Sequence, residues 1–300
     1  MYYGIRYSFI IVIALTICAE IRAEEAAPLS PEEYKMLTYF YQYDKNPDME
    51  VKVVQKNEYE DHFREKIVFR SFRGDWVNGY IGIPKEGTAP YPCVLILHGT
   101  ESYSAAWWDQ GDPGSYNILH NYIQSGFAVL ALDAQYHGER NVNSNFDNIM
   151  EIYREERWSQ IRLLNTNTIT DYLQALDYLE TRPQIDSLRI GAHGYSMGGM
   201  MAFLIAALDT RIKVCATCAA PTWTYPAVIW SPYFFAHAVD DCAILMLAGK
   251  KDTICSIEEV QKTYSLIPSA TKEIKIYNSG HDLPREYEKK AHDWIKKHLK

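Results

Sequence analysis

The chain has 300 residues, 47% of them hydrophobic and 23% charged, a balance that excludes an intrinsically disordered protein and indicates a sizeable core. This length fits one large α/β domain or two small ones. A net charge of −8 argues against nucleic acid and anionic membrane surfaces as partners.

The N-terminus carries the pattern of a secretory leader. Arg6 precedes an apolar run over residues 9–18, and the small residues Ala19 and Ala23 follow. This pattern predicts a signal peptide over residues 1–23 and a secreted or periplasmic protein without stable membrane insertion after cleavage. The apolar run has about half the length that a helix needs to span a bilayer. An uncleaved anchor and cleavage after Ala19 stay open as alternatives.

Export would permit disulfides, so the cysteines beyond the leader matter. There are five of them: Cys93, Cys215, Cys218, Cys242 and Cys255. Their odd number leaves at least one unpaired, and a bridge between Cys242 and Cys255 is one open pairing. Cys215 and Cys218 have C-x-x-C spacing, but no helix begins there to activate a redox pair. No second cluster accompanies them, which disfavours a zinc site.

Residues 24–90 are predicted to form an N-terminal helix and antiparallel strands. A helix is expected over residues 31–43, followed by strands over residues 51–58, 65–72 and 76–84. Arg73, Gly74 and Asp75 supply the turn between the last two strands.

From residue 93 onward, short apolar runs alternate with segments of helical length. The expected strands are residues 93–97, 127–133, 188–195, 214–219, 243–248 and 273–277, and the expected helices are residues 116–125, 148–181, 197–208, 257–267 and 284–299. This alternation predicts a mostly parallel sheet with helices on both faces. No linker or repeat interrupts the pattern, so residues 24–300 are expected to form a single domain. Residues 221–241, rich in aromatics and prolines, are expected to form a small lid.

One stretch of the chain predicts a nucleophile. Gly194-Tyr195-Ser196-Met197-Gly198 matches G-x-S-x-G, a strand-to-helix turn that exposes a serine hydroxyl. The pattern alone is weak, but here it joins an apolar strand to an almost wholly apolar helix. A helix without a polar face must be buried against the sheet, which is the expected setting of such a turn.

A nucleophilic serine needs a base, and the base needs an orienting acid. Asp252 follows the strand over residues 243–248, and His281 follows the strand over residues 273–277. Catalytic groups collect at the carboxyl ends of parallel strands, so both side chains are expected near Ser196. The other downstream carboxylates do not follow a strand end in this way: Asp240, Asp241 and Asp282.

The backbone N–H groups of Met197 and Thr100 are the expected donors to an oxyanion. Met197 directly follows the serine, and Thr100 follows His98-Gly99 at the end of the first parallel strand. His98 is expected to pack and form hydrogen bonds within its loop, with direct proton transfer as the alternative.

The order of these motifs resembles the α/β-hydrolase superfamily from about residue 65 to the end. Within it, the chain is most similar to the branch of dienelactone hydrolases and acetyl esterases. Asp133-x-x-x-His137-Gly138-x-Arg140 is similar to a loop that follows the second parallel strand in many of these enzymes.

The resemblance implies a hydrolase without metal or other cofactor, in which Ser196 is the nucleophile, His281 the base and Asp252 the orienting acid. Dienelactone hydrolases proper have cysteine where Ser196 stands, which favours an ordinary ester as substrate. The expected activity is therefore a serine esterase that acts through an acyl-enzyme.

The substrate is expected to be a small-molecule or carbohydrate ester. Aromatic platforms suit sugar or aryl rings, and the expected substrate contacts are Trp107, Trp108, Tyr195 and Trp223. Packing of the lid onto the core is the alternative role for the aromatics of residues 221–241. A peptidase of the prolyl-oligopeptidase kind and a non-catalytic binding protein on a hydrolase scaffold remain the alternative functions.

Overall fold

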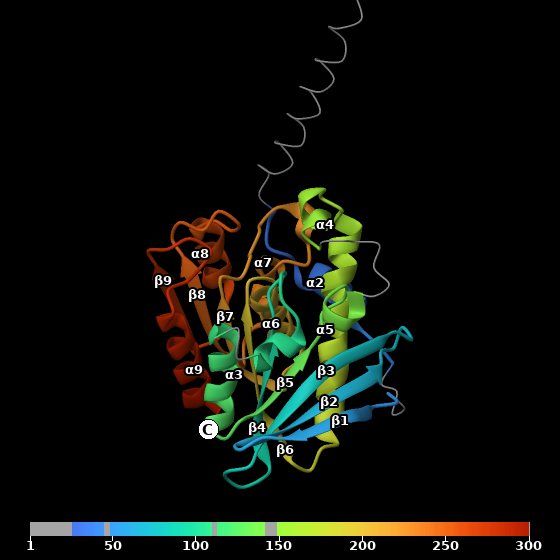
Figure 1. Ribbon diagram of the computed structural model, residues 1–300. Coiled ribbons are helices and arrows are strands. Elements are labelled where there is room, and N and C mark those ends of the chain that lie inside the picture. Colours follow the sequence, from blue (N-terminus) through green and yellow to red (C-terminus); the bar gives the residue numbers. More distant parts are fainter. Residues whose placement is uncertain (1–25, 45–48, 110–112, 142–148, 300) are drawn as a thin grey trace, which may run out of the picture.

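A computed structural model describes residues 26–44, 49–109, 113–141 and 149–299 (Figure 1). The predicted signal peptide lies outside the described residues. Among the described residues, no helix has both the length and the apolar character needed to cross a membrane.

The core of the protein is a nine-stranded sheet in the order β1-β2-β3-β5-β4-β6-β7-β8-β9. The first three neighbouring pairs in this order, from β1 through β2 and β3 to β5, are antiparallel. The remaining pairs, from β5 through β4, β6, β7 and β8 to β9, are parallel. The strands are β1 (Lys52–Glu58), β2 (His62–Arg70), β3 (Trp76–Pro84), β4 (Tyr91–Leu97), β5 (Ala128–Leu132), β6 (Ile185–Tyr195), β7 (Ile212–Cys218), β8 (Ala243–Gly249) and β9 (Lys272–Tyr277). The predicted mostly parallel sheet is confirmed.

Helices cover both faces of the sheet (Figure 1). They are α2 (Pro31–Thr38), α3 (Pro113–Gln124), α4 (Met150–Arg154), α5 (Trp158–Glu180), α6 (Met197–Leu208), α7 (Pro232–Phe235), α8 (Ile257–Leu266) and α9 (Glu286–Leu299). Alternate residues of β4 divide between the two faces, as the two-residue period of a strand requires. Leu95 and Leu97 pack in the cluster that contains α5 and α6, whereas Val94 and Ile96 pack with α3 and α9.

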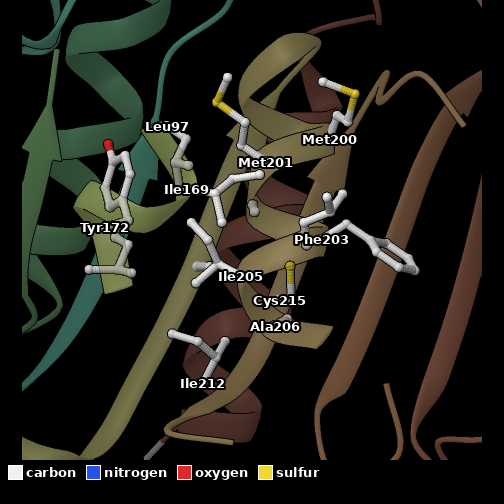
Figure 2. Close-up of a cluster of buried hydrophobic side chains, with 14 of the residues drawn as sticks. Leu97, Ile169, Tyr172, Met200, Met201, Phe203, Ile205, Ala206, Ile212 and Cys215 are labelled. Atoms are coloured by element: carbon white, nitrogen blue, oxygen red, sulfur yellow. The ribbon is translucent and has the colours of Figure 1, made fainter. Parts of the chain in front are cut away.

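Helix α6 is buried between the sheet and α5. Its sequence MGGMMAFLIAAL is rich in strong helix formers and lacks a polar face, so burial is its stable environment. Figure 2 shows Met201 and Ile205 near Ile169 and Tyr172 of α5, and all four belong to one core cluster. This packing holds the N-terminus of α6, where Ser196 lies, against the sheet.

One predicted helix is wrong. The chain over residues 148–181 does not form a continuous helix but α4 and α5, separated at Glu155–Arg157. Glu156 has a φ of 51°, in the left-handed region that interrupts a right-handed helix. Four consecutive charged residues, 154–157, interrupt the apolar pattern at this break, a signal that the prediction of one helix did not use.

Two other predicted boundaries also differ. The N-terminal helix was expected to reach residue 43, but α2 ends at Thr38 and continues as a 3₁₀ turn over Tyr39–Tyr41. Strand β6 begins at Ile185 rather than near residue 188, because Ile185 pairs with Tyr91 of β4. Such a long-range partner is invisible to a local pattern.

The five cysteines in the described part of the chain are all buried and free, so Cys242 and Cys255 form no bridge. Burial raises the pKa of each thiol, for example that of Cys93 to about 12. Buried, protonated thiols of this kind pack as small hydrophobes, and Cys255 in addition accepts the N–H of Thr222 at 3.1 Å.

Candidate active site

Ser196 occupies the turn between β6 and α6 in a strained conformation. Its φ of 53° and ψ of −120° lie where residues with a side chain are rare. A serine before a helix commonly accepts a hydrogen bond from the first turn, but the Ser196 side chain makes no such capping bond. The turn directs the hydroxyl away from the helix and leaves it available to a base.

Two glycines make this turn sterically feasible. A Cβ at Gly194 would lie 2.1 Å from the carbonyl oxygen of Gly198, and a Cβ at Gly198 would lie 2.2 Å from that of Leu97. Both distances are far below van der Waals contact. The glycines therefore let the turn pack against the end of β4, where the loop that contains Thr100 begins.

The structure brings Ser196, His281 and Asp252 together in one hydrogen-bonded chain. The Ser196 hydroxyl lies 2.8 Å from His281 Nε2, and His281 Nδ1 lies 2.8 Å from Asp252 Oδ2. A carboxylate only accepts, so Nδ1 carries a proton and Nε2 is free to accept one from the serine. This is the arrangement of a nucleophile, a base and the acid that orients the base.

The loops after β8 and β9 are joined by backbone hydrogen bonds. Lys250 N–H donates to the carbonyl of Tyr277, and Lys251 N–H donates to that of Ser279, both at 2.8 Å. Asp252 Oδ1 also accepts the N–H of Ile254 at 2.8 Å, which orients its other oxygen toward the imidazole. The carboxylate is nearly buried, with 5% of the side chain exposed. This burial shields its contact with the imidazole from solvent.

Tyr195, at the end of β6, holds the loop that contains His281. Its hydroxyl donates to the carbonyl of His281 at 2.7 Å and accepts the N–H of Leu283 at 3.0 Å. Burial raises the pKa of Tyr195 to about 12, so the phenol keeps its proton at neutral pH. The sequence predicted Tyr195 as a substrate contact. The structure shows that it also positions the loop, a role that strand-end spacing does not indicate.

Replacing Tyr195 by phenylalanine is expected to lower kcat by about 10- to 100-fold with little change in KM, because a small displacement of a general base impairs proton transfer. The unpartnered Leu283 N–H should also cost about 1–3 kcal/mol in free energy of unfolding. Steady-state kinetics on a chromogenic ester and thermal melts measure the two effects.

Tyr277→Phe is the matched control for this change. The Tyr277 hydroxyl is buried and has no hydrogen-bond partner among the described residues, so its removal should leave kcat unchanged. A Tyr195→Phe protein that is less stable but has normal kcat would limit Tyr195 to a structural role.

The predicted oxyanion donors, Met197 and Thr100, both lie beside Ser196. They line one cavity with it, and neither backbone N–H donates a hydrogen bond to any residue that the structure describes. Met197 is the first residue of α6, where the helix dipole adds partial positive charge. Two N–H groups beside Ser196 that have no partner among the described residues suit a developing oxyanion.

Two buried histidines brace the loop that contains Thr100. His98 Nε2 accepts the N–H of Ala134 at 3.1 Å, so the proton is on Nδ1, which donates to the Gly99 carbonyl at 2.8 Å. His137 Nε2 lies 2.8 Å from the Thr100 carbonyl. Burial lowers the pKa of His98 to about 3, so it is neutral. With both nitrogens engaged, His98 has the packing role expected of it.

The Asp133–Arg140 motif anchors the same loop from β5. Asp133 accepts the N–H groups of Ser104 and Glu139, at 2.8 and 2.9 Å. Arg140 forms a 2.8 Å ion pair with buried Asp171. These contacts give the motif a structural role around the loop of residues 98–104.

Two cavities open beside Ser196 and share part of their lining. The first has a volume of about 490 Å³ and includes Met200, Trp223 and Tyr225 in its lining. The second has a volume of about 580 Å³ and includes His281 in its lining. Among the described residues, Thr100, Met150, Ser196 and Ile254 line both.

The predicted substrate contacts divide between these cavities. Trp223 lines the first cavity, and Trp107 and Tyr195 line the second, whereas Trp108 lines neither and packs against Tyr80 at 5.2 Å between ring centroids. Tyr153 and Trp158 line the first cavity as well. The sequence did not single them out, because they lie in the segment predicted as one continuous helix.

The aromatic segment over residues 221–241 is mostly buried. Trp230, Tyr233, Phe234 and Phe235 belong to the core cluster that contains α6. For these four rings the packing alternative is therefore the one that the structure shows.

A profile of the dienelactone hydrolase family matches residues 77–295, which contain all of the groups described above. The chain belongs to the dienelactone hydrolase family. It is therefore a member of a family of hydrolases, as the resemblance implied.

Similarity to individual proteins agrees with this assignment. "Putative hydrolase YtaP" of Bacillus subtilis is 30% identical over 184 residues, which are 57% of each chain. "Esterase FrsA" of Klebsiella pneumoniae is 26% identical over 149 residues, 49% of this chain and 29% of FrsA. The chain thus spans about half or less of the length of these curated relatives.

Solved structures show the same fold. Acetyl xylan esterase 1 from Thermoanaerobacterium sp. JW/SL YS485 superposes with a TM-score of 0.74 and 19% identity, over 94% of this chain and 98% of that one. A cold-adapted esterase from an Arctic intertidal metagenomic library gives a TM-score of 0.67 at 20% identity, over 82% and 98%. The predicted α/β-hydrolase fold is confirmed.

Proposed function

We propose that this protein is a serine hydrolase that cleaves carboxylic esters through an acyl-enzyme. The observation that carries the proposal is the chain of two 2.8 Å contacts from the Ser196 hydroxyl through His281 to Asp252. Membership of the dienelactone hydrolase family and similarity to proteins named as esterases support the ester as the bond cleaved.

The proposed reaction has two steps. In the first, His281 Nε2 takes the hydroxyl proton as Ser196 Oγ attacks the ester carbonyl, and the N–H groups of Met197 and Thr100 hold the oxyanion. The carbon–oxygen bond to the alcohol then breaks, and His281 gives its proton to the departing oxygen. In the second step, water attacks the acyl-enzyme with His281 again as base, which releases the acid and restores Ser196.

Two features of the sequence extend the proposal. The leader over residues 1–23 supports export to the periplasm or the medium, and mass analysis of the N-terminus of exported protein would reveal the cleavage. The aromatic residues near Ser196, together with the leader, support a carbohydrate ester among the candidate substrates. A small-molecule ester is the simpler alternative.

Covalent labelling and a substrate panel test the proposal. A fluorophosphonate probe should label the wild-type protein at Ser196, and 4-nitrophenyl esters should be hydrolysed much faster than peptide anilides. Labelling with the opposite preference would identify a peptidase. Absence of both labelling and turnover would identify a non-catalytic binding protein.

A further inference from the structure

The two cavities beside Ser196 are not equivalent, because only the larger one contains His281. The imidazole that takes the serine proton must deliver it to the departing alcohol, so the alcohol has to lie on the side of His281. The 580 Å³ cavity then receives the alcohol, and the 490 Å³ cavity receives the acyl group. This assignment rests on the proposed serine-esterase function.

We propose that the acyl group of the substrate is bulky and carries an aromatic ring. A volume of about 490 Å³ lies in the range of pockets that bind drug-sized ligands. An acetyl group extends from the carbonyl carbon by a single methyl, which is about the size of one water molecule (roughly 30 Å³). Acetyl would leave most of the acyl cavity filled with water. An arylalkanoyl group would fill much of it.

The walls of the acyl cavity are aromatic. The rings of Trp158 and Trp223 each lie 6.3 Å from that of Tyr225 between ring centroids. The indole N–H of Trp223 donates to the Ile254 carbonyl at 2.8 Å, which satisfies its polar atom and fixes the ring. Rings held at such spacings favour a further ring in stacked or edge-to-face contact.

Met197 and Met200 complete the apolar lining close to the nucleophile. Thioether side chains adapt their shape and make favourable contacts with aromatic rings. An aromatic group attached to the acyl carbon would share the cavity with these side chains and with the rings of Trp223 and Tyr225.

The acidic residue in the acyl cavity is already engaged. Glu259 accepts hydrogen bonds from the N–H and hydroxyl of Ser256, both at 3.1 Å, and from the N–H of Thr224 at 3.2 Å. Its carboxylate stabilises the start of α8 and does not require a cationic ligand. A neutral acyl group therefore fits the described lining.

The alcohol cavity differs from the acyl cavity in charge, although aromatic side chains such as Trp107 and Tyr195 line it too. Its lining includes four charged side chains: Glu101, Asp282, Arg285 and Glu288. Charged side chains of this kind can form hydrogen bonds with an alcohol that has several hydroxyls. Because three of the four are acidic, they disfavour an alcohol that carries negative charge. The contrast between the two cavities predicts an ester of an aromatic acid with a polar alcohol. Hydrolysis would release that alcohol first, and then the aromatic acid from Ser196.

Three 4-nitrophenyl esters with a common alcohol test the acyl preference: the acetate, the hexanoate and the 3-phenylpropanoate. The hexanoate has comparable reach but no ring. We expect kcat/KM for the phenylpropanoate to exceed that for each of the others by at least about tenfold, because ring contacts add to binding in the transition state.

Failure of the acyl assignment can be distinguished from failure of the proposed esterase function. Faster hydrolysis of the acetate, or equal kcat/KM for all three esters, would overturn the acyl assignment while leaving the esterase function intact. Loss of all turnover together with absent fluorophosphonate labelling would instead refute the proposed function.

A variant tests the cavity directly. Trp223→Ala is expected to lower kcat/KM for the phenylpropanoate by about tenfold or more and to change that for the acetate by less than about threefold. Trp76→Ala, at an exposed position on β3, is the matched control and should change neither. Equal losses on both esters in Trp223→Ala would contradict the proposal. If Trp223→Ala does not fold, Tyr225→Leu tests the same wall with a smaller change in volume.

Discussion

Replacement of Ser196 by alanine is expected to lower kcat by about 10⁴- to 10⁶-fold, with KM changed little. The hydroxyl is the only group at the elbow that the His281 imidazole can activate, at 2.8 Å from Nε2. The residual rate would come from the oxyanion donors and from substrate binding, which the substitution leaves in place. Stopped or continuous assays with a 4-nitrophenyl ester measure the loss.

The fold should survive this substitution. The Ser196 side chain makes no capping bond to α6, so alanine removes no hydrogen bond from the helix. The positive φ is equally unfavourable for alanine, and the free energy of unfolding should change by less than about 1 kcal/mol. Fluorophosphonate labelling should disappear in Ser196→Ala and persist in Ser265→Ala, a control on α8. Activity within tenfold of wild type would show that Ser196 is not the nucleophile.

Replacement of Asp252 by asparagine is expected to lower kcat by about 10³- to 10⁴-fold. Asparagine fills the same space and can keep the bond from the Ile254 N–H through its carbonyl oxygen. Its amide would then face His281 Nδ1 as a donor, which forces the imidazole proton onto Nε2. In that tautomer Nε2 cannot accept the proton of Ser196, so the base is lost although the geometry is kept.

The matched control is Asp240→Asn. Asp240 is exposed, accepts the N–H of Asp241 through Oδ1 and precedes β8, so it lies at the far end of that strand from Asp252. The same loss of one charge there should leave kcat unchanged. Equal, small effects of the two substitutions would mean that Asp252 contributes only general electrostatics and does not set the tautomer of His281.

The site residues most accessible to sequence reasoning are those marked by local pattern. The Gly194–Gly198 pentapeptide between an apolar strand and an apolar helix predicts the sharp turn, and its glycines are needed where a Cβ would collide with backbone. Asp252 and His281 were found by a topological argument, since parallel strands bring their carboxyl ends to one edge. In the structure both lie within hydrogen-bonding distance of their expected partners.

Other features could not be predicted from the sequence, because they depend on contacts between distant parts of the chain. Tyr195 donates a hydrogen bond to the carbonyl of His281, which lies 86 residues further along the sequence. The residues around Tyr195 contain no pattern that predicts this bond. The break at Glu156 depends on a left-handed backbone conformation, which the run of charged residues 154–157 does not by itself specify. Trp108 resembled a substrate platform in the sequence, yet it packs against Tyr80.

Local chemistry thus accounts for the class of fold, the order of the elements, the elbow and the three residues of the hydrogen-bonded chain. These features depend on local patterns: apolar periodicity, the steric limits at glycine and the position of a residue at a strand end. Each pattern extends over a few residues and can therefore be read from the sequence. The division of the space around Ser196 into two cavities, of which the one beside His281 has the more charged lining, is different. It arises because Trp158, Met200 and Trp223, from separate elements, line one cavity. His281 lines the other. Only the folded chain sets which side chains share a cavity, because that depends on the packing of helices and loops across the whole sheet.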